Sequence, residues 1–170
     1  MKLLKLTALS LASLASLLFL ASCEPDAEQD RTTDFEKKSI IMTGANESPA
    51  NASAAIGKLD VFYTKDTRLL SYKVTWSGLT DSVLLMHIHG LAPEGYNAGV
   101  VQSIVTTSGG VFPQKTAGKF TFAKSGTLSG TLLADGVVIK EEDILNGRYY
   151  INIHTTPFPG GEIRGQIKFQ

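Results

Sequence analysis

Hydrophobic and polar residues alternate along most of the chain beyond residue 39, with the period of two that β-strands produce. In the clearest case, residues 68–76, the apolar face collects Leu70, Tyr72, Val74 and Trp76. Further short strands are expected over 40–42, 57–64, 83–89, 99–105, 118–123 and 128–133. With a final strand pair and one short helical turn over 140–145, about eight strands predict an all-β fold, an antiparallel β-sandwich or Greek-key barrel.

The last strand pair, within residues 146–169, has an apolar face and a polar face. Glycines and prolines over 157–161 mark the connection between its two strands. The apolar face is expected to close a core. The polar face is the natural place to look for function, and it carries Asn152, His154, Glu162 and Arg164.

The beginning of the chain predicts export and lipid attachment. Lys2 and Lys5 precede an apolar and small-residue run over 6–20, which is typical of a secretory signal and short for a membrane-spanning helix. The only cysteine, Cys23, follows Leu-Ala-Ser in a sequence that resembles a bacterial lipobox. That resemblance implies cleavage before Cys23 and acylation, including palmitate-type chains, that anchors the protein to a membrane of the bacterial cell envelope. The alternative is an ordinary secretory peptide followed by a stray cysteine.

Three segments are therefore expected: a lipoprotein signal peptide over 1–22, a flexible acidic tether over 23–38 and one domain over 39–170. The early acidic residues of the tether either form a solvated linker or act as an export signal to the outer leaflet. The expected location is the outer membrane, facing the periplasm or the cell surface.

Composition excludes several classes of function. The chain has 16 basic and 16 acidic residues, and no basic cluster that would neutralise nucleic-acid phosphates. It also lacks a Gly-x-Ser-x-Gly nucleophile motif and a phosphate-binding glycine loop. A non-enzymatic role is favoured, although a serine nucleophile paired with a histidine stays open. No catalytic residue is assigned.

The three histidines are candidate metal ligands. His87 and His89 are two residues apart, so in a strand their imidazoles lie on one face, about 7 Å apart along it. Neutral imidazoles suit Zn or Cu, with His154 as a third ligand and Glu162 as a fourth ligand or a supporting partner. Such a site would make metal-assisted activity an option. The alternative is that the histidines are structural and hydrogen-bond to groups beneath loops.

Other polar residues have open roles. Glu162 and Arg164 share one strand face and could pair with each other, or Arg164 could present its guanidinium to an anionic ligand. Glu47, in a loop before Ser48 and Pro49, is either an anchoring group or a ligand-binding group. With Asn152, these residues form a candidate polar surface for a protein or glycan ligand.

Three separated motifs resemble the CHRD domain, the module first described in chordin. They are Gly-Ala-Asn-Glu-Ser-Pro over 44–49, His-Ile-His-Gly over 87–90, and Tyr-Ile-Asn-Ile-His-Thr over 150–155 with Pro-Gly-Gly-Glu-Ile-Arg-Gly-Gln-Ile over 159–167. The resemblance runs from about Ser39 to Phe169. One departure is Ser48, where the family usually has an apolar residue before the proline.

The resemblance implies an extracytoplasmic β-rich domain that acts as a binding or structural module, with no established catalytic activity. The His-x-His strand is also similar to that of copper-zinc superoxide dismutase sandwiches, but only at the level of the fold. Three histidines are fewer than that enzyme's two-metal site uses, and its disulfide has no counterpart here. Dismutase activity is therefore not expected.

Overall fold

The computed structural model describes residues 34–105 and 123–170. Cys23, the expected signal peptide and the first part of the expected tether lie outside the described residues. The strand expected over 118–123 also lies outside them, except for Ala123. In the part of the chain that is described, no helix has the length and apolar character needed to cross a membrane.

The described residues form an all-β domain, as the alternation predicts. Its strands, in chain order, are β1 (Asp34–Thr43), β2 (Ile56–Thr64), β3 (Leu69–Ser77), β4 (Leu85–Gly90), β5 (Val100–Val105), β6 (Gly126–Leu133), β7 (Tyr149–His154) and β8 (Ile163–Ile167). The 3-10 turn η1 (Gly44–Asn46) follows β1, and the short helix α2 (Glu141–Leu145) stands where the helical turn is predicted.

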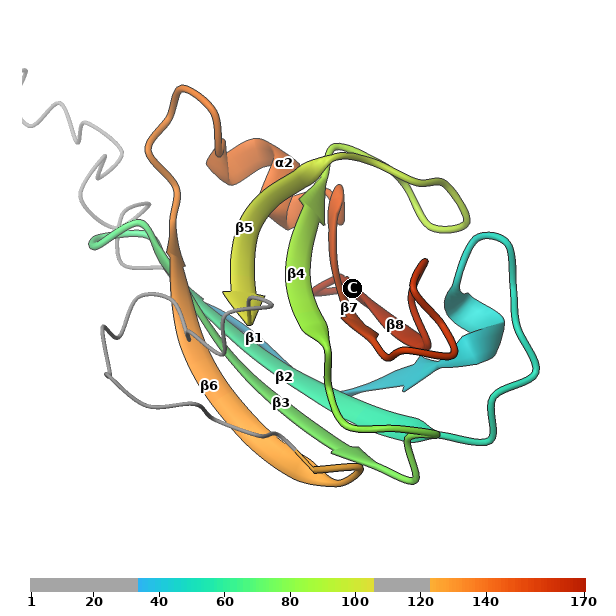
Figure 1. Ribbon diagram of the computed structural model, residues 1–170. Helices are drawn as coiled ribbons and strands as arrows, with labels where there is room; N and C mark the ends of the chain where they lie inside the picture. The colour runs from blue at the N-terminus through green and yellow to red at the C-terminus, as the bar shows by residue number, and fades with distance from the viewer. Residues whose placement is uncertain (1–33, 106–122) are drawn as a thin grey trace, which may run out of the picture. The chain divides into compact units, whose positions relative to one another are not determined.

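All eight described strands belong to one antiparallel sheet, in the order β5-β4-β7-β8-β1-β2-β3-β6. The sheet curls into a nearly closed barrel, with β5 and β6 as its edges (Figure 1). A side chain bridges these edges, because Gln102 Nε2 on β5 donates to the Thr131 carbonyl oxygen on β6 at 3.2 Å. That contact joins the two edge strands of the described sheet.

The core lies inside the curled sheet and is built from alternate positions of each strand. On β3, the apolar face predicted from the sequence is buried throughout. Met86 and Ile88 of β4 and Ile151 and Ile153 of β7 add to the same core. Leu84, within the strand expected over 83–89, lies ahead of β4 and is 37% exposed. Burial of this continuous apolar surface is the main stabilising contribution to the domain.

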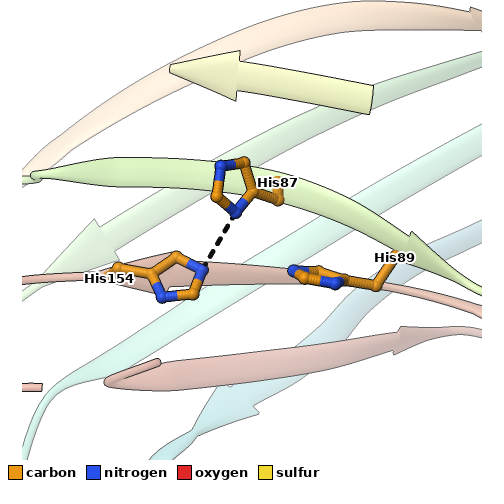
Figure 2. Close-up of side chains that lie close together, drawn as sticks. All are labelled: His87, His89 and His154. Atoms are coloured by element: carbon orange, nitrogen blue, oxygen red, sulfur yellow. Dashed lines mark hydrogen bonds between the residues drawn. The ribbon is translucent and has the colours of Figure 1, made fainter. Parts of the chain in front are cut away.

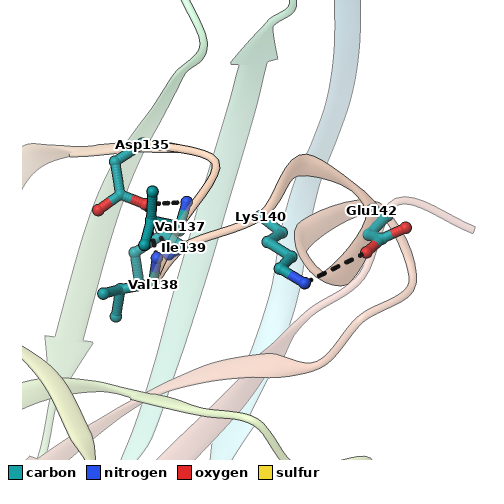
Figure 3. Close-up of polar contacts among 6 residues, drawn as sticks. All are labelled: Asp135, Val137, Val138, Ile139, Lys140 and Glu142. Atoms are coloured by element: carbon teal, nitrogen blue, oxygen red, sulfur yellow. Dashed lines mark hydrogen bonds and ion pairs between the residues drawn. The ribbon is translucent and has the colours of Figure 1, made fainter.

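A tight turn leads from β6 into α2. The Asp135 carboxylate accepts hydrogen bonds from three successive backbone amides, those of Val137, Val138 and Ile139, at 2.8–2.9 Å (Figure 3). Lys140 pairs with Glu142 at 4.0 Å on the exposed side of the helix, where an ion pair contributes little to stability. The turn thereby places α2 against the end of the barrel.

One expectation about the strands needs correction. β1 already begins at Asp34, ahead of the domain boundary expected at Ser39, so residues 34–38 are strand and not tether. The alternation there was obscured because the pairing of β1 with β2 shifts register between Lys37 and Ile40, and Ser39 has a φ of 57°.

The final hairpin is buried on both faces. Every residue of β7 and β8 is buried, including the residues of the predicted polar face. The covering comes from three connections: the one after η1, the one between β4 and β5, and the one between β7 and β8. Figure 1 shows these segments, in cyan, yellow-green and red, on one side of the sheet. The polar face is therefore a buried layer between the sheet and the loops that cover it.

Candidate functional site

Strand register assembles the polar face from distant parts of the sequence. His87 of β4 lies opposite Asn152 of β7, which lies opposite Arg164 of β8. In the next row, His89 lies opposite Tyr150, and Tyr150 opposite Gln166. Because side chains at every second position share a face, these two rows and His154 form one contiguous layer.

The three histidines converge within this layer. His87, His89 and His154 each offer a ring nitrogen, and these atoms all lie within 4.8 Å of one another. The shortest approach, 3.2 Å, joins His87 Nδ1 and His154 Nε2 (Figure 2). Two imidazoles come from β4 and one from β7, so two paired strands hold the group together.

Hydrogen bonds fix the protonation of the rings. His154 Nδ1 lies 3.0 Å from the Pro159 carbonyl oxygen, and His89 Nδ1 lies 2.9 Å from that of Ala98. A carbonyl oxygen only accepts, so both Nδ1 atoms carry the proton and both Nε2 atoms keep a lone pair. His87 Nδ1 must then be the donor to His154. His89 Nε2 is buried without a hydrogen-bond partner, which leaves one lone pair unused.

The surroundings keep these imidazoles neutral. Burial, followed by the neighbouring His154 and His89, lowers the pKa of His87 to about 4. Burial also lowers the pKa of His89 and that of His154 from their usual values. At neutral pH all three rings are therefore uncharged, which is the form that binds a metal ion.

Glu162 lies elsewhere on this face and does not belong to the group of converging ligands. Its carboxylate accepts hydrogen bonds from the hydroxyls of Ser53, Thr80 and Thr155 and from the Thr80 amide, at 2.5–2.9 Å. Although burial acts to raise it, these donors hold the pKa of Glu162 below its usual value. Glu162 thus joins three separate segments of chain, and both of its oxygens are already used.

Arg164 does not pair with Glu162, and no ion pair between described residues links them. Its guanidinium carbon lies 3.4 Å from the centroid of the Tyr150 ring. Its nitrogens donate to Gln166 Oε1 at 3.0 Å and to Asn97 Oδ1 at 3.5 Å. The guanidinium is only 1% exposed and closed in by these groups, so it is not presented to solvent as an open anion site.

Glu47 enters the layer from the loop after η1. It is buried beside Gly161, whose φ of 127° favours glycine; a Cβ there would overlap Glu47 Oε1. Burial raises the pKa of Glu47 to about 7, while Arg164 and Asn152 act to lower it. Glu47 Oε1 and Asn152 Oδ1 are both buried without a hydrogen-bond partner. The site therefore contains two buried acceptors, Glu47 Oε1 and Asn152 Oδ1, that no donor uses.

Several contributors to this site were not predicted from the sequence. Tyr150 stacks on His89 with ring centroids 4.8 Å apart and planes 5° apart. The backbone carbonyls of Ala98 and Pro159 orient the histidines, and no sequence pattern marks a carbonyl for that role. The alternation along 149–154 places Tyr150 on the polar face with Asn152 and His154, but it predicts no role for this ring in the site.

Residues 38–167 match the CHRD domain family, which covers most of the chain. The chain belongs to the CHRD domain family. Comparisons with curated proteins and with solved structures gave no match. Membership suggests a binding or structural module, in agreement with a domain whose polar side chains are gathered in one layer.

The CHRD-like motifs of the sequence meet at this layer. The motif over 44–49 supplies Glu47, the motif over 87–90 supplies two histidines, and the motifs over 150–155 and 159–167 supply the third histidine and Arg164. The features that identify this CHRD domain are thus largely those that build its polar face.

Proposed function

We propose that this CHRD domain is the binding module of a lipid-anchored protein of the bacterial cell envelope, and that its polar face binds a transition-metal ion, Zn or Cu. The observation that carries the metal proposal is the convergence of one ring nitrogen from each of His87, His89 and His154 within 4.8 Å. A structural role explains Nδ1 of His89 and Nδ1 of His154, because each donates a hydrogen bond to a backbone carbonyl. It does not account for the unused Nε2 of His89.

The spacing fits a metal–imidazole site. With Zn–N bonds of 2.0–2.1 Å and tetrahedral angles, two ligand nitrogens lie about 3.3 Å apart. The 3.2 Å between His87 Nδ1 and His154 Nε2 is close to that value. In the metal-bound form, His87 would carry its proton on Nε2 and leave the lone pair of Nδ1 for the ion. Small side-chain rotations would bring the remaining separations, at most 4.8 Å, into the same range.

The support around the rings also fits. Metal-binding histidines commonly donate their second ring N–H to a carbonyl or carboxylate, which fixes the ring and strengthens the other nitrogen as a ligand. His89 and His154 have this arrangement already, through Ala98 and Pro159. Both oxygens of Glu162 are used in hydrogen bonds that hold the fold together. A bound ion would therefore have three protein ligands and a further coordination position for water or another small ligand.

Metal content tests this proposal. The untagged mature chain carrying Cys23→Ser, purified from rich medium, is expected to contain or to take up about one equivalent of Zn or Cu by mass spectrometry. His87→Ala is the most informative variant, because this ring is the least buried of the three and makes no hydrogen bond to backbone among the described residues. It should weaken metal binding by about 100-fold or more.

Glu94→Ala is the matched control, since it removes an exposed acidic side chain from the connection between β4 and β5. Metal binding that Glu94→Ala reduces as much as His87→Ala does would be adventitious surface binding. A domain that stays empty after incubation with Zn and with Cu would refute the metal proposal and leave the histidines as structural groups.

The lipid anchor is proposed from the lipobox-like sequence that ends at Cys23. In a bacterial host, the full chain should incorporate a labelled fatty acid and sediment with membranes, because more than one acyl chain gives stable anchoring. Cys23→Ser should abolish the labelling. Membrane association and labelling that persist in this variant would contradict the proposal.

A further inference from the structure

A second concave site lies beside the histidines and contains none of them. A cavity of about 400 Å³ opens between the loop over 47–51 and the β7–β8 connection over 157–161, with Asn97 at its side. Its volume falls in the range of small-molecule sites, about 300–1,000 Å³. The three histidines are not among its lining residues, so a ligand here would not have to bind the metal.

Hydrogen bonds hold the walls of this cavity in place. Asn51 Nδ2 donates to the carbonyl oxygens of Gly161 and Glu162, both at 3.1 Å, which ties the two loops together. Asn97 Nδ2 donates to the Ser48 carbonyl oxygen at 2.6 Å. A pocket whose walls are already ordered loses little entropy when a ligand binds.

The inner wall of the cavity has an acceptor that lacks a donor. Glu47 lines the cavity, is only 7% exposed, and has no hydrogen-bond partner at Oε1. Asn152 is 2% exposed, lies near Gly161 outside the lining of the cavity, and has no hydrogen-bond partner at Oδ1. Leaving such buried groups unpaired costs free energy. A ligand that brings O–H or N–H donors would recover part of that free energy.

Above the pKa of Glu47, which is about 7, the charge of this wall is balanced. The nearby Arg164 guanidinium interacts electrostatically with Glu47, and both are buried. Glu47 would attract a cationic ligand and Arg164 would repel it. For an anionic ligand the two effects are reversed. A neutral ligand with several donors is therefore favoured.

The rim of the cavity is apolar and partly flat. Phe158 is half-buried there, between Pro157 and Pro159, and Pro49 stands on the facing loop. Aromatic and proline rings of this kind pack against the C–H faces of sugar rings, while the sugar hydroxyls are donors. From this combination we propose that the cavity binds a neutral saccharide, the end of a glycan chain, through hydroxyl donation to Glu47 and packing on Phe158.

Nuclear magnetic resonance titration tests the proposal. The mature chain carrying Cys23→Ser is titrated with chitobiose, cellobiose, maltose and mannobiose, each up to about 10 mM, a range that detects millimolar affinity. At least one disaccharide should shift the backbone amide signals of 48–51 and 157–161 in a saturable way. Spermidine and a uronic-acid disaccharide, the cationic and anionic probes, should bind more weakly than that sugar.

Phe158→Ala should weaken sugar binding about tenfold, because it removes the packing surface of the rim. The control is Phe62→Ala, which truncates another partly exposed phenylalanine, on β2. Metal content should be unchanged in both variants, which separates this proposal from the metal proposal. The saccharide proposal is overturned if no disaccharide shifts those signals, if a charged probe binds more tightly, or if both phenylalanine variants bind equally well.

Discussion

Two buried glutamates of the same polar face have opposite surroundings. Glu162 accepts four hydrogen bonds, from Ser53, Thr80 and Thr155, and these hold its pKa below the usual value against the effect of burial. Glu47 has an oxygen without any partner, and burial raises its pKa to about 7. The first carboxylate is fully used by the fold. The second has hydrogen-bonding capacity left over.

The rest of the polar layer shows the same difference between groups that have hydrogen-bond partners and groups that lack them. Around Glu162, hydroxyls and amides from three segments are paired. Toward the histidines, the unpaired atoms are His89 Nε2, Asn152 Oδ1 and Glu47 Oε1, and all three are acceptors. Folded proteins leave few buried polar atoms unpaired. The proposed metal and saccharide sites both use these unpaired acceptors, whereas the hydrogen-bonded part around Glu162 holds the loops in place.

The largest expected effect comes from breaking the saturated part. Glu162→Ala would leave the hydroxyls of Ser53, Thr80 and Thr155 and one amide without their acceptor. We expect it to lower the free energy of unfolding by about 3–4 kcal/mol, measured by urea denaturation. Glu142→Ala, on the exposed side of α2, is the control and should change it by less than about 0.5 kcal/mol. Similar small losses in both variants would remove the distinction between the two parts of the layer.

Alternation predicted the strands well where one face meets the core and the other meets water. β3 is the example, since Leu70, Tyr72, Val74 and Trp76 are buried while polar residues stand between them. The final hairpin is different, because both of its faces are buried. Its polar residues are covered by loops, and loops have no periodicity that a sequence could reveal.

The candidate site was predicted in part for the same reason. His87 and His89 are two apart on one strand, so their common face followed from the sequence, and the structure brings His154 to them. Glu162 was placed with Arg164 by counting along a strand. However, β8 begins at Ile163, and Gly161 changes the direction of the chain just ahead of it. Hydrogen bonds from distant hydroxyls, and not strand parity, decide where that carboxylate lies.

An intermediate effect should come from acidifying the metal-free domain. The pKa of His87 is lowered to about 4 in the fold, from an ordinary value of 6.5. As the pH falls from 6.5 toward 4, the unfolded chain gains this proton before the folded chain does, so stability is lost in that window. The loss should be on the order of 1–2 kcal/mol, allowing for the half-buried position of the ring.

His87→Asn isolates this contribution, because Glu47 has the opposite pH dependence over part of the same range. Urea denaturation in the presence of a chelator, at steps from pH 7.5 to 4.5, would measure the difference in stability between the protein and the variant. This difference should move in favour of His87→Asn as the pH falls. A difference that is independent of pH would show that the imidazole is not held neutral.

The smallest expected effect is that of replacing Glu47 at pH 5. Its pKa is raised from an ordinary 4.5 to about 7, so as the pH rises through this window the unfolded chain releases the proton first and the folded protein loses stability. Gln has a similar shape and does not titrate. Glu47→Gln should therefore change the free energy of unfolding by less than about 1 kcal/mol at pH 5. At pH 8 the stability of the variant relative to the native protein should be higher than it is at pH 5. If Glu47→Gln were instead as damaging as Glu162→Ala at both values, Glu47 would be a second structural hub and would have no spare acceptor to offer a ligand.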